Sequence, residues 1–188
     1  MADFKKRDFD DFVQRQQLEL SASQSVKQFN ARDELQYWLG RLNALYSDIQ
    51  GYLDEYIKQG QVKCEIGEIE LREDFSGVYR APTMQIEIGL KKVRVVPIGT
   101  MLIGSKGRVD IAGPAGTARL ALINAKTKSP RQMVRVEIVD PTRPRQASSA
   151  EREEPEWVWK FIGPSASATF VDLGKESFLE AILDVSNG

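Results

Sequence analysis

Two absences limit the side chains that could carry chemistry in this chain. The 188 residues contain no histidine and one cysteine, Cys64. A Ser-His-Asp or Cys-His relay therefore lacks its base, and neither a His-ligated metal nor a cysteine-rich zinc site can be assembled. Any reaction would use carboxylates, lysine, tyrosine or a hard cation such as Mg²⁺. We expect no catalytic residues, no metal ligands and no cofactor.

Charge patterning is the strongest functional signal. Residues 79–145 hold thirteen Lys and Arg against four Asp and Glu, whereas residues 1–78 hold ten against fifteen and residues 146–188 hold three against eight. A basic middle predicts an anionic partner, or acidic ends that fold back onto it. The expected partner-binding residues are Lys91, Lys92, Arg94, Lys106, Arg108 and Arg135.

A short pattern in the basic segment resembles a nuclease motif. Asp110 and the later Asn124-Ala125-Lys126 are similar to the pattern Asp…Glu-x-Lys, in which two carboxylates on adjacent strands hold Mg²⁺. Asn124 replaces the second carboxylate, which would weaken metal binding. The alternative is an ordinary β-hairpin in which Asp110 and Lys126 are solvated, and we favour it.

Two other clusters are open to more than one interpretation. The carboxylates between Glu65 and Asp74 surround an expected strand, and we interpret them as a solvated face or a surface that meets the basic segment. Trp157, Trp159 and Phe161 share one face of another expected strand. Such a row either fills a core under a helix or forms a stacking platform for bases.

The apolar periodicity predicts helices before residue 60. Leu35, Leu42, Ile49 and Tyr56 recur every seven residues, and other apolar residues widen this stripe. The stripe is too wide and aromatic for a coiled-coil seam, which favours packing on a sheet. A shorter helix is expected over 5–20, with a break at Ser21 to Ser25.

After Gly60 the apolar period changes to two, which predicts strands. The expected strands are 62–72, 84–90, 92–96, 100–103, 108–112, 117–124, 134–138 and 157–162. The turns between several of them are too short for helical crossovers, so the sheet should be mainly antiparallel. Residues 141–155 are rich in Pro, Ser and charge and predict a mobile loop, and 175–185 predict a closing helix.

These elements predict one α+β domain over 1–188, with a helical part at 1–60 and a β-rich part at 61–188. A helical pair would pack on a curved, mainly antiparallel sheet of about seven or eight strands, and a short C-terminal helix would close it. The start of the chain has no signal-like apolar region, and no apolar run reaches the roughly 20 residues that a membrane helix needs. With a lone cysteine, this favours a bacterial-type cytoplasmic protein that does not enter a membrane.

The function expected from these features is non-enzymatic binding of an acidic macromolecule by a basic sheet surface, with inhibition or neutralisation of that partner as one role. A nucleic-acid-binding domain that uses the same residues is the first alternative. A degenerate divalent-metal nuclease is the second. Both a monomer and a dimer through the helix are compatible with the sequence.

Overall fold

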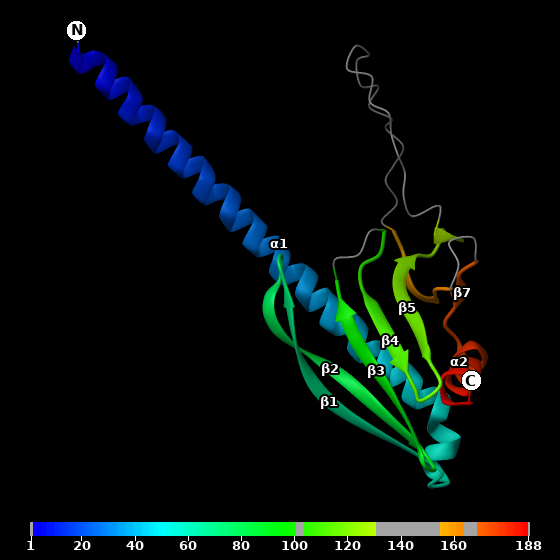
Figure 1. Cartoon of the computed structure of the whole chain (residues 1–188). Helices are drawn as coiled ribbons and strands as arrows, with labels where there is room; N and C mark the ends of the chain where they lie inside the picture. Colours follow the sequence, from blue (N-terminus) through cyan, green and yellow to red (C-terminus); the bar gives the residue numbers. More distant parts are fainter. Residues whose placement is uncertain (1, 101–103, 131–154, 164–168, 188) are drawn as a thin grey trace.

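The structure is a computed structural model that describes residues 2–100, 104–130, 155–163 and 169–187 (Figure 1). In chain order its elements are α1 (Ala2–Lys58), β1 (Val62–Glu73), β2 (Gly77–Ile88), β3 (Lys91–Gly99), β4 (Arg108–Ala112), β5 (Thr117–Asn124), β6 (Trp157–Phe161), β7 (Val171–Asp172) and α2 (Lys175–Asn187). The predicted α+β class, antiparallel sheet and closing helix are confirmed. The expected strand at 134–138, nearly all of the expected strand at 100–103 and nearly all of the expected loop at 141–155 lie outside the described residues.

The N-terminal helix is continuous, so the predicted helical pair with a break at Ser21 to Ser25 is wrong. The expected break, Ser21 to Ser25, contains no glycine or proline, and an interior serine costs a helix only a few tenths of a kcal/mol relative to alanine. At 1.5 Å per residue the 57 residues of α1 span about 85 Å. The N-terminal half of α1 therefore extends beyond the sheet, as Figure 1 shows.

The C-terminal half of α1 packs on the sheet through the predicted stripe. Trp38, Leu42, Leu45, Tyr46, Ile49 and Leu53 are buried in the main core, and Leu35 and Leu39 pack against its edge. Helix α2 adds Phe178, Ile182 and Val185 to the same core. Both helices therefore cover one face of the sheet, which we call the inner face.

The sheet is a simple meander. Its seven described strands pair in the order β1 to β7, each antiparallel to its chain neighbour. The bounds of β4 and β5 coincide with the predicted strands 108–112 and 117–124. Short turns connect β1 to β2, β2 to β3 and β4 to β5, and this explains why these neighbouring strands in the sequence are also neighbours in space.

The long β1–β2 hairpin is curved and rotates its buried side along its length. In β2 the buried residues change from Tyr79 and Ala81 to Met84 and Ile86, across Pro82. The Tyr46 hydroxyl donates to the Pro82 carbonyl at 2.8 Å, which ties this irregular point to α1. The loss of simple alternation explains why the first half of β2 is absent from the predicted strands.

Candidate functional site

The outer face of the sheet, opposite the helices, carries three of the six predicted basic residues. Lys92 and Arg94 of β3 and Arg108 of β4 alternate along their strands with buried residues, so their side chains lie on this outer face. The register places Glu87 opposite Lys92, and Asp110 opposite Arg119 of β5. The outer face of β2–β5 is thus a mixed array of cations and carboxylates.

Lys92 and Arg108 are neutralised by neighbouring carboxylates on this face. Lys92 Nζ lies 2.9 Å from Glu87 Oε1, and Arg108 makes two 2.7 Å hydrogen bonds to the Asp110 carboxylate. The hydrogen bond from Lys92 lowers the pKa of Glu87, and the bonds to Asp110 raise the pKa of Arg108. Among the described residues, Arg94 and Arg119 form no ion pair, so they carry the excess positive charge of this face.

The remaining predicted residues lie elsewhere. Lys91 is on the inner side, where its ammonium donates to the Ser186 carbonyl at the end of α2 at 3.2 Å. Lys106 precedes β4 and pairs with Glu34 of α1. Arg135 lies outside the described residues. The structure therefore brings together Lys92, Arg94 and Arg108 but not all six, and their role in binding stays a prediction.

Arg119 is the outer-face residue that the sequence prediction missed. It belongs to the basic segment and to a correctly predicted strand, but the sequence alone does not say which side of that strand the helices cover. The pairing of Asp110 with Arg119 places Arg119 on the outer face. Alternation along β5 from the buried Leu120 and Leu122 is the signal that could have identified it.

The nuclease-like residues do not converge. Asp110 is on the outer face and opposite Arg119, whereas Asn124 is five residues further along β5 and on the inner side. Five residues of a strand span roughly 17 Å. The Asn124 side chain instead accepts a 2.9 Å hydrogen bond from the backbone N–H of Lys126, which stabilises the turn. In the described parts of the chain, no group of three or more Cys, Asp and Glu could hold a metal ion.

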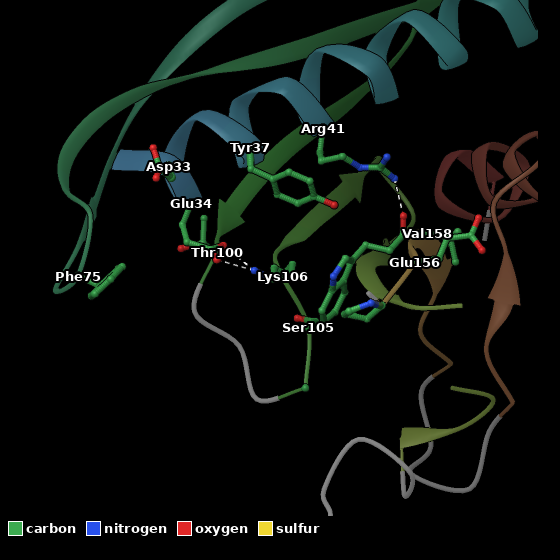
Figure 2. A pocket seen from close by; sticks show the side chains of 13 residues that line it. Asp33, Glu34, Tyr37, Arg41, Phe75, Thr100, Ser105, Lys106, Glu156 and Val158 are labelled. Atoms are coloured by element: carbon green, nitrogen blue, oxygen red, sulfur yellow. Dashed lines mark hydrogen bonds and ion pairs between the residues drawn. The ribbon is translucent and has the colours of Figure 1, made fainter. Parts of the chain in front are cut away.

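A cleft of about 1300 Å³ lies on the inner side, between α1 and the ends of β3, β4 and β6 (Figure 2). Helix α1 contributes Asp33, Glu34, Tyr37 and Arg41, which fall on one side of the helix at spacings of three to four residues. Other lining residues come from three separate segments: Phe75, Thr100, Ser105, Lys106, Glu156 and Trp157.

Lys106 is the central cation of this cleft. Its Nζ lies 2.6 and 2.8 Å from the two carboxylate oxygens of Glu34. It also lies 5.8 Å from the ring centroid of Tyr37 and 5.6 Å from that of Trp157. One ammonium group is thus held by a carboxylate and two aromatic rings, within the range of cation–π attraction.

The aromatic row of β6 divides between core and cleft. Trp159 is buried, with its ring centroid 5.9 Å from that of Trp38. Trp157 is half-buried and lines the cleft, where Arg41 donates a 2.8 Å hydrogen bond to its backbone carbonyl. The core interpretation is therefore correct for Trp159, and the half-buried Trp157 and Phe161 pack against the same core, with Trp157 also lining the cleft.

Comparisons of this chain with known protein families, with curated proteins and with solved structures give no match. In the described residues, no helix combines the length and the apolar content needed to cross a membrane.

Proposed function

We propose that this chain is a non-enzymatic binding protein that holds an acidic protein partner against the outer face of its sheet. The observation that carries the proposal is the pair Arg94 and Arg119, whose charge no described neighbour neutralises. Binding through this face would allow the protein to inhibit or neutralise its partner.

The spacing of the two arginines suits a protein surface. They lie two strands apart and are offset by two residues, which corresponds to roughly 12 Å between their Cα atoms. Val96 and Ala112, both half-buried, lie between them. Arginine binds a carboxylate through two parallel hydrogen bonds and is enriched at protein interfaces, where it commonly flanks small apolar areas.

The existing ion pairs define which substitutions are informative. Reversal of Lys92 or Arg108 would break an ion pair and place a second carboxylate beside Glu87 or Asp110, which would disturb the sheet. Arg94→Glu with Arg119→Glu breaks no ion pair and changes only exposed residues. The new carboxylate at position 119 would lie opposite Asp110, so the stability should change by no more than about 1 kcal/mol per site. The matched control, Arg32→Glu with Arg72→Glu, makes the same change of charge on α1 and β1.

The test is affinity capture from lysate with the wild type, the outer-face double variant and the control, each with and without nuclease treatment. We expect wild type and control to retain the same protein after nuclease treatment, and the outer-face variant to lose it. Retention of that protein by the outer-face variant would contradict the proposal.

Nucleic acid is the alternative partner for the same face, and salt distinguishes it. Each neutralised phosphate of duplex DNA contributes about −0.9 to the slope of log affinity against log salt. Contacts from Arg94 and Arg119 alone predict a slope of about −1.8. Capture that disappears after nuclease treatment, together with this slope in a direct binding assay, would replace the protein partner with nucleic acid.

A further inference from the structure

We propose that the cleft beside α1 is a binding site for a small organic cation, and that the side chain of Lys106 occupies this site in the free protein. The site, which we call the cage, consists of the Tyr37 and Trp157 rings and the Glu34 carboxylate. It is separate from the outer face of the sheet and does not depend on the function proposed for that face.

The Lys106 ammonium shows what the cage binds. It touches a carboxylate at 2.6 Å and lies within 6 Å of two ring centroids. The negative faces of aromatic rings attract cations, and paired rings are a known device for recognising quaternary ammonium groups. A side chain of the protein itself therefore takes the position that a ligand's ammonium would occupy.

The charge of the cleft also favours a cation over an anion. Its lining holds three carboxylates, Asp33, Glu34 and Glu156, and two cations, Arg41 and Lys106. Within the described residues, Asp33 and Glu156 form no ion pair. When the Lys106 side chain leaves the cage, three carboxylates face one guanidinium, so an incoming cation gains attraction that a phosphate or carboxylate would not.

The walls of the cage do not depend on the Lys106 side chain. The backbone N–H of Lys106 donates to the Leu122 carbonyl at 2.8 Å, and the Leu122 N–H donates to the Gly107 carbonyl at 2.9 Å. Arg41 fixes the backbone of Trp157. Truncation of Lys106 should therefore leave Tyr37, Trp157 and Glu34 in place and open the site.

Displacement of the Lys106 side chain from the cage costs little free energy. Its side chain is 31% exposed and that of Glu34 is 47% exposed, so the ion pair is partly solvated and contributes little. A quaternary ammonium is larger and more weakly hydrated than a primary ammonium and gains more from the two rings. The volume of about 1300 Å³ leaves room for the rest of a small molecule.

The direct test compares choline binding to the wild type and to Lys106→Ala by tryptophan fluorescence titration. We expect Lys106→Ala to bind about tenfold more tightly, because the competing ammonium is gone. Lys106→Ala combined with Tyr37→Leu should lose at least that tenfold. The matched control Lys92→Ala, which removes a lysine outside the cleft, should bind like the wild type.

A neutral isostere separates charge from shape. In 3,3-dimethylbutan-1-ol a carbon replaces the nitrogen of choline, and we expect Lys106→Ala to bind it at least tenfold more weakly than choline. Equal binding of the two compounds, or equal binding of choline by wild type and Lys106→Ala, would overturn the proposal. Free trimethyllysine and a short peptide that contains it show whether the cation belongs to a metabolite or to a protein side chain.

A measurement on the wild type covers the case in which Lys106→Ala fails to fold. Ring currents from Tyr37 and Trp157 shift the NMR signals of the Lys106 side chain away from those of a free lysine. Saturating choline should return these signals to the free position. Signals that stay unchanged at saturating choline would refute displacement.

Discussion

Replacement of Gly107 by alanine should destabilise the protein severely. The backbone φ of Gly107 is +152°, which residues with a side chain rarely adopt, and a Cβ here would lie 2.2 to 2.7 Å from three ring carbons of Trp38. Trp38 is fully buried, so its ring cannot move aside without disturbing the core. Backbone strain of about 1–3 kcal/mol and overpacking of about 1–3 kcal/mol together predict a loss of about 2–6 kcal/mol.

Urea denaturation followed by tryptophan fluorescence measures this loss, provided that the m-value of the variant equals that of the wild type. Gly40→Ala is the matched control, because Gly40 is an exposed helical residue with nothing within 4 Å of the added Cβ. The same chemical change should there stabilise the protein by about 1 kcal/mol.

A double-mutant cycle with Trp38→Leu isolates the cause of the effect. Once the ring is gone, the added methyl group has space, and Gly107→Ala should cost only the backbone strain. We expect a coupling free energy of at least about 1 kcal/mol between the two sites. Additive losses, or a Gly107→Ala variant within about 0.5 kcal/mol of the wild type, would refute the close approach of Gly107 to Trp38.

The other predictions concern the helix contact and one ion pair. Leu42 is fully buried, so Leu42→Ala should cost about 2–5 kcal/mol in urea denaturation, whereas Asn43→Ala on the exposed side should change stability by less than about 0.5 kcal/mol. Equal effects would mean that α1 does not pack there. Lys92→Met should raise the pKa of Glu87 toward its ordinary value in a carboxyl NMR titration, since Lys92 is the main cause of the lowered pKa. A lowered carboxyl pKa stabilises the folded state at pH values above the unfolded-state pKa, and this contribution is lost as the pH falls. The difference in the free energy of unfolding between wild type and Lys92→Met should therefore vanish in acid. An unchanged Glu87 pKa would contradict the ion pair.

Local patterns were sufficient to predict most of the sheet. The strand at 108–112 alternates cleanly and lies between glycine-containing turns, and the strand at 117–124 is an apolar run that begins directly after one of these turns. The first half of β2 was missed because Pro82 interrupts the pattern and the buried side changes there. The two-residue strand β7 has no pattern of its own and exists through its pairing with β6.

The sites were harder to predict, because sequence shows what a strand carries but not which side is covered. Lys91 and Lys92 are adjacent in the chain, yet one donates to α2 and the other faces outward. The cage joins Glu34, Lys106 and Trp157 from three distant segments, and only the folded chain reveals it. The charge surplus of residues 79–145 was visible in the sequence, but its partial neutralisation on one face was not.

The meander also has a consequence for the order in which the protein can be assembled on the ribosome. Neighbouring strands pair soon after they are made, because short turns carry a small loop-closure cost. The contact of Trp38 with Trp159 is different, since 121 residues separate them in the chain. At 5–20 residues per second, about 6–24 s pass between the synthesis of the two rings. During that interval the apolar stripe of the nascent helix lacks its partners from β6 and α2, which leaves it open to chaperones and to premature association.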